Sequence, residues 1–191
     1  MSLFDIGIDL GTVSTIITVG GKGIVVNEPS VIAYDNKKER IIAVGREAYN
    51  MIGRTPAYIS VINPLTNGVI SDSTMAEAML AELIRRVRGS LMVKPRVMIC
   101  VPPSVTDAEK RAFAEAALSV DARNVFLIGS PVAALLGAGI DISKPCGYMV
   151  ADIGGGTTDI AVVSFKGIVG SVSIKASGNN LDDAIISYRP S

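Results

Sequence analysis

Short apolar runs separated by glycine-rich turns open the chain. Residues 5–9 and 15–19 are predicted to be strands on either side of a turn at 10–14. Glycines and a lysine at 20–23 predict a second turn, which leads into a strand at 24–26. Three shorter elements are predicted next: strands at 31–34 and 41–44 and a short helix at 45–51.

From residue 74 the apolar positions recur at helical spacing. Residues 74–88 are predicted to be an amphipathic helix, because one stripe carries the apolar side chains Met75, Met79, Leu80, Leu83, Ile84 and Val87. Thr74 and Glu77 have the spacing of a capping box at the start of this helix, and Gly89 is placed to end it.

Strands and helices alternate after this helix. A buried strand is predicted at 96–101, and a capping box of Thr106 and Glu109 begins a helix that runs to about Leu118. The pattern then predicts a strand at 125–128, a helix at 131–139 and a strand at 148–151. Such alternation is typical of a partly parallel sheet with helices packed on it.

An internal repeat is the most informative feature of the sequence. In both copies an apolar strand ends in an aspartate, Asp9 or Asp152, and a Gly/Thr turn, a strand, a Lys-Gly turn and a further strand follow. The aspartates are 152 − 9 = 143 residues apart, and the lysines of the Lys-Gly turns are 166 − 22 = 144 apart. Because this period is too long for a solenoid, two copies of one hairpin facing a shared ligand are expected.

Composition narrows the classes of function. The 191 residues are 49% apolar and 19% charged, which is typical of a globular protein. Lys plus Arg and Asp plus Glu both total 18, so no net positive charge favours nucleic acid as a partner. The sequence has no histidine, which excludes His-based triads and argues against most zinc and haem sites.

The cysteines and the uncharged stretches bear on the compartment. Cys100 lies in an apolar run and is predicted to be a buried thiol, and with Cys146 far from it in sequence a reducing cytoplasm is expected. The uncharged stretch at 124–140, which no other in the chain exceeds in length, contains glycines and a proline and is slightly short for a membrane span. Neither a signal peptide nor a membrane crossing is predicted.

The paired turns have the chemistry of a phosphate site. Backbone N–H groups of a Gly/Thr turn can converge on one anion, and glycine is expected where φ is positive or a phosphate oxygen must approach closely. The candidate glycines are Gly11, Gly154, Gly155 and Gly156, and the candidate hydroxyl donors are Thr12, Ser14, Thr157 and Thr158. Asp9 and Asp152 would repel bare phosphate, so Mg²⁺ is expected between carboxylates and phosphate oxygens.

A glycine-rich turn on its own more often does no more than close a hairpin. Two matched turns, each with its own strand-terminal aspartate, favour the functional interpretation. No Walker A pattern occurs, and residues 20–23 are too short for a dinucleotide fingerprint. The phosphate chemistry is therefore predicted to be neither of the P-loop nor of the Rossmann type.

These segments resemble the superfamily of actin, the DnaK-type chaperones and the sugar kinases, and within it the MreB family of rod shape-determining bacterial actins. The matching segments are DIGIDLGT at 5–12, GIVVNEPS at 23–30, AVG at 43–45, GRTP at 53–56, KPRV at 94–97 and DIGGGTT at 152–158. The NEPS and GRTP motifs favour this family over the chaperones. The resemblance extends to Tyr188.

The resemblance implies an α/β, ribonuclease-H-like actin-type ATPase fold, with a mixed sheet and helices packed on it. Only the first lobe is expected, because family members are roughly twice as long. Residues 1–31 and 66–191 would form the phosphate-binding subdomain and 32–65 a small inserted subdomain. The second lobe, which supplies the adenine pocket, is expected to be absent, so the chain would hold phosphates from one side only, with weakened nucleotide affinity.

The resemblance also implies ATP and Mg²⁺ as ligands and assigns site residues. Thr12, Val13 and Ser14 would form the first phosphate loop, and Gly154, Gly155, Gly156 and Thr157 the second. Asp9 and Asp152 stand where the family organises magnesium and the attacking water.

Two departures from the family pattern bear on activity. Ser130 stands where a glutamate usually orients or activates the water, and a serine cannot act as the base at neutral pH. Binding is therefore expected to be retained and hydrolysis to be slow, unless Asp152 suffices. Asn179 and Asn180 replace an acidic pair, and Pro190 could not continue a helix that begins near Leu181.

Further partners follow from the resemblance alone. It implies filaments of the protein itself, cell-wall synthesis machinery as a partner, and a cytoplasmic position at the inner face of the cell membrane. Leu91 and Met92 lie where the family carries a membrane-inserting loop, and arginines and a lysine nearby would suit anionic lipid. The alternative, that Leu91 and Val93 cap the core, stays open.

Three other functions share the two turns. A sugar or acetate kinase would need a substrate pocket between lobes, and no acid/base set for it is found in the sequence. A chaperone would need a peptide-binding domain. A fragment that only interacts with full-length filaments would lower their assembly without assembling alone.

Overall fold

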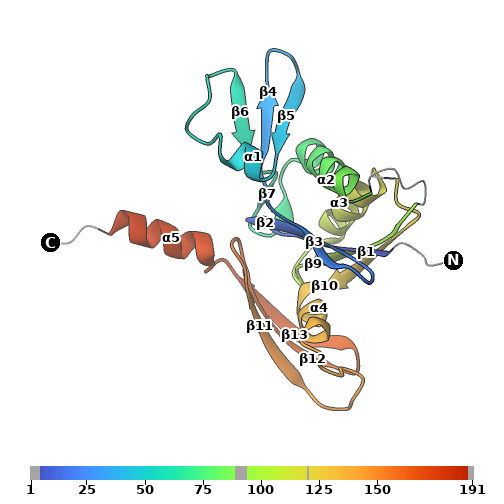
Figure 1. The fold of residues 1–191 in the computed structure, drawn as a ribbon. Coiled ribbons are helices and arrows are strands. Elements are labelled where there is room, and N and C mark those ends of the chain that lie inside the picture. The colour runs from blue at the N-terminus through green and yellow to red at the C-terminus, as the bar shows by residue number, and fades with distance from the viewer. Residues whose placement is uncertain (1–4, 89–93, 120, 189–191) are drawn as a thin grey trace.

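A five-stranded mixed sheet lies at the centre of the molecule (Figure 1). The structure, a computed structural model, describes residues 5–88, 94–119 and 121–188. The strand order is β10-β9-β1-β2-β3, with β1 antiparallel to β2 and parallel to β9. The strands are β1 (Asp5–Leu10), β2 (Ser14–Val19), β3 (Gly23–Pro29), β9 (Arg96–Val101) and β10 (Asn124–Gly129). The predicted partly parallel sheet is confirmed.

Side chains along β1 alternate between the two faces of this sheet, and the apolar ones identify the face that the helices cover. Ile6, Ile8 and Leu10 are at most 3% exposed and belong to the core formed with α2 (Ser73–Arg88) and α3 (Asp107–Leu118). Residues between them face the other side of the sheet. On that side Met98 of β9 and Phe126 of β10 are register partners and remain 44% and 50% exposed.

The predicted apolar stripe of α2 is buried, but the helix begins differently from the prediction. Its four central members, Met79, Leu80, Leu83 and Ile84, are at most 2% exposed. Asp72 Oδ1 accepts a hydrogen bond of 3.0 Å from Met75 N, so the carboxylate of Asp72 caps a helix that starts at Ser73. The predicted cap of Thr74 with Glu77 is therefore wrong, and Gly89 lies outside the described residues.

The capping box predicted for α3 is confirmed. Thr106 N donates to Glu109 Oε2 at 2.6 Å, and Glu109 N donates to Thr106 Oγ1 at 3.3 Å. The reciprocal bonds satisfy two N–H groups that a helix start otherwise leaves unpaired. Phe113, in the middle of this helix, is fully buried in the core.

A second, smaller sheet is inserted between β3 and α2. Its order is β5-β4-β6, built from β4 (Ile32–Asp35), β5 (Arg40–Val44) and β6 (Ile59–Ile62), with α1 (Arg46–Tyr49) beside it and a short ribbon of β7 (Leu65–Thr66) and β8 (Val69–Ile70) after it. This sheet falls within the predicted inserted subdomain at 32–65, whose boundaries stay a prediction. The predicted strands at 31–34 and 41–44 and the short helix are confirmed.

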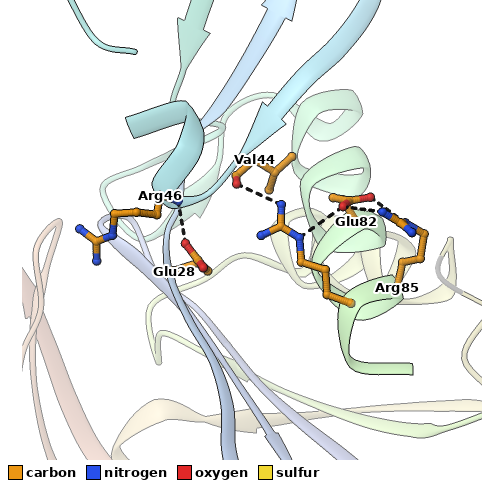
Figure 2. Close-up of polar contacts among 6 residues, drawn as sticks. Glu28, Val44, Arg46, Glu82 and Arg85 are labelled. Carbon is orange, nitrogen blue, oxygen red and sulfur yellow. Dashed lines mark hydrogen bonds and ion pairs between the residues drawn. The ribbon is translucent and has the colours of Figure 1, made fainter. Parts of the chain in front are cut away.

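Two polar contacts hold the base of this small sheet to the central body (Figure 2). Glu28 Oε2 accepts a hydrogen bond of 2.6 Å from Arg46 N, at the start of α1. Arg86 of α2 donates to Val44 O at 3.3 Å while its Nε contacts Glu82, and Glu82 also binds Arg85. The small sheet is thus joined to both β3 and α2.

The second copy of the repeated hairpin forms a third sheet, whereas the first copy belongs to the five-stranded sheet. β11 (Tyr148–Ile153), β12 (Thr158–Ser164) and β13 (Gly167–Ile174) pair in antiparallel order, and α4 (Ser130–Gly137) packs on β11 and β12. These strands are hydrogen-bonded to one another and form no part of the five-stranded sheet. The predicted subdomain at 66–191 therefore contains strands of both sheets, and its boundaries stay a prediction.

The last helix, α5 (Gly178–Ser187), begins three residues before Leu181 and extends away from the body (Figure 1). Asn180 Oδ1 accepts hydrogen bonds from Ser177 N and Ser177 Oγ, which fixes the start of the helix. Its apolar side chains Leu181, Ile185 and Ile186 are between 64% and 80% exposed. Among the described helices, none combines the length and apolar character needed to cross a bilayer.

The core around α3 predicts that two phenylalanine-to-alanine substitutions differ greatly in their effect on stability. Phe113→Ala removes a fully buried ring and is expected to lower the free energy of unfolding by about 3–5 kcal/mol. The matched control Phe126→Ala removes a half-exposed ring and is expected to cost less than about 1 kcal/mol. Urea unfolding followed by circular dichroism measures both, and equal losses would contradict this account of the core.

Candidate functional site

The two repeated turns meet at one pocket. It has a volume of about 140 Å³ and lies between the turn after β1 and the turn after β11. Eleven of the residues predicted from the sequence line it: Asp9, Gly11, Thr12, Val13, Ser14, Ser130, Asp152, Gly154, Gly155, Gly156 and Thr157. The prediction that the Thr158 hydroxyl serves as a donor in the pocket is wrong, because this hydroxyl donates to Ala176 O at 2.5 Å and Thr158 does not line the pocket. The predicted membrane residues Leu91 and Met92 lie outside the described residues.

The first turn is held through its carbonyl groups. Ser30, which is fully buried, donates from Oγ to Gly11 O at 2.6 Å and from N to Val13 O at 3.0 Å. Asn63 Nδ2 donates to Thr12 O at 2.7 Å. Three successive carbonyl groups are thereby bonded by residues on the two connections between the central body and the small sheet.

The second turn is held in the same way by α5. Gly178 N and Asn179 N, at the start of that helix, each donate at 3.0 Å to the carbonyl oxygens of Gly154 and Gly155. Gly154 N closes the turn by donating to Thr157 O at 2.8 Å. The amide groups at the helix start, which have no partner within a helix, are thus used to fix the turn.

At least four backbone N–H groups of the pocket have no acceptor in the described part of the chain. They include the N–H groups of Thr12 and Val13 in the first turn and of Gly155 and Gly156 in the second. Backbone N–H groups are strong donors that folded proteins seldom leave without an acceptor. Two turns that present such donors to one pocket have the chemistry of an anion site.

A positive φ, one of the two reasons predicted for the glycines of the turns, does not apply, while the other, close approach of a phosphate oxygen, stays a prediction. None of Gly11, Gly154, Gly155 and Gly156 has a positive φ. A Cβ at Gly155 would lie 2.8 Å from Val13 Cβ, and one at Gly156 would lie 2.8 Å from Thr12 Cβ. Gly155 and Gly156 of the second turn therefore make room for side chains of the first turn.

The acidic groups of the pocket disfavour one another's charge. Asp9 is open to the pocket, yet the surrounding walls remove much of its water, and this desolvation raises its pKa, with a further contribution from the charge of Asp152. Desolvation also raises the pKa of Asp152; the charge of Asp159 adds to this, and the Ser130 hydroxyl opposes it. A cation placed between Asp9 and Asp152 would relieve this repulsion.

Asp159 is a pocket residue that the sequence analysis did not select. It is 4% exposed and accepts hydrogen bonds from Ser173 Oγ and, at 3.3 Å, from Thr157 Oγ1. Its carboxylate therefore holds a hydroxyl of the second turn. The only sequence signal was its position seven residues after Asp152, on the same hairpin.

Two further side chains complete the wall. Ser130, the first residue of α4, buries its Oγ atom, which makes no hydrogen bond of ordinary geometry with any described residue although it lies near enough to Asp152 to favour its charged form. Cys100 is half-buried, and burial together with the charges of Asp9 and Asp152 raises the pKa of its thiol to about 11. The thiol therefore stays protonated at neutral pH and is no nucleophile.

Comparison with known proteins identifies relatives of this chain. A family model described as MreB/Mbl protein matches residues 3–190. The cell shape-determining protein Mbl of Bacillus subtilis is 50% identical over 186 residues, which make up 96% of this chain and 56% of that protein. The cell shape-determining protein MreB of Escherichia coli is 46% identical over 190 residues, which make up 96% of this chain and 55% of that protein.

A solved structure agrees with these relatives. The crystal structure of MreB5 of Spiroplasma citri bound to ADP superposes with a TM-score of 0.88 and 41% identity, over 96% of this chain and 55% of that one. The expected actin-type fold with a mixed sheet and packed helices is confirmed by this match. The chain spans about half the length of the relatives it matches, as expected for the first lobe.

The raised pKa of Asp9 predicts a pH dependence of stability. A raised pKa means that the folded protein binds the proton more tightly than the unfolded chain, so the free energy of unfolding falls as pH rises from the ordinary value of 3.8 through the raised one. Asp9→Asn is expected to remove part of this fall, so the variant gains on the wild type as pH rises.

Asp5→Asn is the matched control with the opposite sign. The hydrogen bond and charge of Arg96 lower the pKa of Asp5, so its contribution to stability is lost as pH falls and the variant should not gain on the wild type at higher pH. Urea unfolding between about pH 4 and pH 8 measures both curves. Parallel curves for the wild type and Asp9→Asn would contradict the prediction.

Proposed function

This chain belongs to the MreB/Mbl protein family, and we propose that it binds the phosphates of ATP, together with Mg²⁺, between the turns after β1 and β11. The observation that carries the proposal is the pair of matched turns, which both bring N–H groups without acceptors in the described chain to one pocket. A terminal phosphate between them would accept hydrogen bonds from both turns. The hydroxyls of Ser14 and Thr157 line the same pocket and can add donors.

The acidic residues of the pocket fit a magnesium ion. Among the described residues no three His, Cys, Asp or Glu side chains gather to form a metal cage, so the protein would contribute only the carboxylates of Asp9 and Asp152. Mg²⁺ commonly binds through one or two carboxylates, phosphate oxygens and water. The bound ion would neutralise the charge between carboxylate and phosphate, and Asp152 would orient the attacking water.

The size of the pocket supports binding of the phosphates of ATP without its adenine. Its volume of about 140 Å³ is below the roughly 300–1,000 Å³ of sites that enclose a whole small molecule. The MreB5 relative is bound to ADP in its crystal structure, and this chain spans 55% of that protein. We therefore expect this pocket to hold the phosphates of a nucleotide and to leave its adenine outside.

The cellular part of the proposal is that this is an ATP-binding bacterial actin homologue that polymerises into membrane-associated filaments and guides cell-wall synthesis. Its support is the naming of the Mbl and MreB relatives as cell shape-determining proteins. Leu91 and Met92 are the proposed membrane contacts. Self-association, the inner membrane surface and the cell-wall machinery are the partners to test.

Titration with ATP in the presence and absence of Mg²⁺ tests the binding proposal. Asp152→Asn is expected to weaken Mg²⁺-ATP binding at least about tenfold, because a carboxylate ligand is lost. Without Mg²⁺ the same change is expected to strengthen ATP binding, because a negative charge beside the phosphates is removed. Calorimetry or a fluorescent ATP analogue measures both constants.

Asp107→Asn is the control for this titration, because Asp107 is an exposed acid on α3 away from the pocket. It should leave both affinities at the wild-type values. Sedimentation and electron microscopy of the same samples then report whether assembly follows nucleotide. Absence of saturable phosphate-dependent binding by the wild type would overturn the proposal.

Ser130 leads to a prediction about hydrolysis. Its buried Oγ can hold a water but cannot accept a proton at neutral pH, so we propose slow turnover of bound ATP. Ser130→Glu supplies a base at the wall of the pocket and is expected to raise phosphate release by about 10²-fold. Ser130→Gln is the control, because glutamine is similar in size to glutamate but is no base. Equal rates of phosphate release from the Glu and Gln variants would contradict this prediction.

A further inference from the structure

The two turns touch each other through side chains of the first and glycines of the second. A Cβ at Gly155 would lie 2.8 Å from Val13 Cβ and closer still to Val13 Cγ2, while the next nearest atom, Asn179 Oδ1, would be 3.7 Å away. Val13 is therefore the main neighbour that requires a glycine at position 155. Thr12 has the same relation to Gly156.

Both sides of this contact are held firmly from behind. Val13 O accepts from Ser30 N, and Gly155 O accepts from Asn179 N, each at 3.0 Å. Neither turn can therefore retreat without breaking hydrogen bonds to the element that supports it. The side chain of Val13 is 49% exposed, so the core does not account for its position.

The contact joins two sheets that share no strand pairing. The first turn belongs to the five-stranded sheet and the second to the sheet of β11, β12 and β13. The separation between the turns is therefore not fixed by a common ladder of hydrogen bonds. The side chains and glycines that meet at the pocket have to set it.

We infer that Val13 is a positioning residue, whose contact with Gly155 sets the spacing of the two turns and hence the fit of the pocket to phosphate. The N–H groups of Val13 and Gly155 both lack acceptors in the described chain, so the contacting residues are also two of the proposed phosphate donors. Hydrogen bonds weaken steeply when donors move out of line or range. This inference rests on the proposed phosphate site and specifies what holds its two halves in register.

A double-mutant cycle tests the contact. Gly155→Ala places a methyl group against Val13 and is expected to weaken binding of Mg²⁺-pyrophosphate roughly tenfold by forcing the turns apart. Val13→Ala in the same chain removes the Cγ atoms but leaves its Cβ 2.8 Å from the added methyl, so the recovery should be partial. Val13→Gly removes that contact as well, and the recovery in the Val13→Gly, Gly155→Ala variant should be larger.

Gly170→Ala is the matched control, because a Cβ there meets nothing within 4 Å and its φ is not positive. It should leave affinity unchanged. The unfolding midpoints of the same variants, measured without ligand, give a test that does not depend on binding. Rescue of a poorly folded Gly155→Ala variant by Val13→Gly would support the contact. Equal losses with and without the Val13 substitution, or Gly155→Ala behaving like Gly170→Ala, would overturn it.

The two proposals fail in different ways. If the wild type binds neither pyrophosphate nor ATP, the phosphate site is wrong, and the coupling in unfolding midpoints still reports on Val13 and Gly155. If the wild type binds phosphate but the cycle shows no coupling, the site stands and Val13 does not position it.

Discussion

Hydrogen bonding to the carbonyl groups of Gly11, Thr12 and Val13 is the constraint on which the pocket depends. A peptide carries a donor and an acceptor pointing in opposite directions, so fixing the acceptors on one side of a turn directs donors to the other. Ser30 and Asn63 supply this fixation for the first turn, and the start of α5 supplies it for the second. In the proposed function, the acidic residues would then favour an anion that arrives with a cation.

The architecture places this constraint between sheets that do not pair with each other. β1 brings the first turn to the end of the central sheet, and β11 brings the second to the end of its own sheet. Because α4 packs on β11 and β12 and follows directly from β10, the central sheet and the third sheet are connected beside the pocket, where Ser130 lies. Packing thus brings the sheets together, while the contacts at the turns define the width of the gap.

Sequence reasoning recovered the parts of this arrangement that are local. The repeat identified both turns and both aspartates because strand, turn and glycine are written in consecutive residues. It missed Asn63, which is 51 residues from the Thr12 carbonyl it binds, because no periodicity records that contact. It placed Thr158 in the pocket beside Thr157, but the Thr158 hydroxyl bonds to Ala176 O. The reason is that successive side chains of an extended chain point to opposite sides. All four predicted glycines line the pocket, but the side chains that need the space at Gly155 and Gly156 lie about 140 residues away and only the fold reveals them.

Ser30 and Asn63 also determine where the chain can be lengthened. Both lie at the crossings into the small sheet, so an added residue at either crossing would displace a donor from the turn it supports. The hairpin tip at 36–39 is exposed and lies between β4 and β5, beyond both crossings. A fluorescent reporter inserted at that tip would travel with the small sheet and leave the pocket's supports in register.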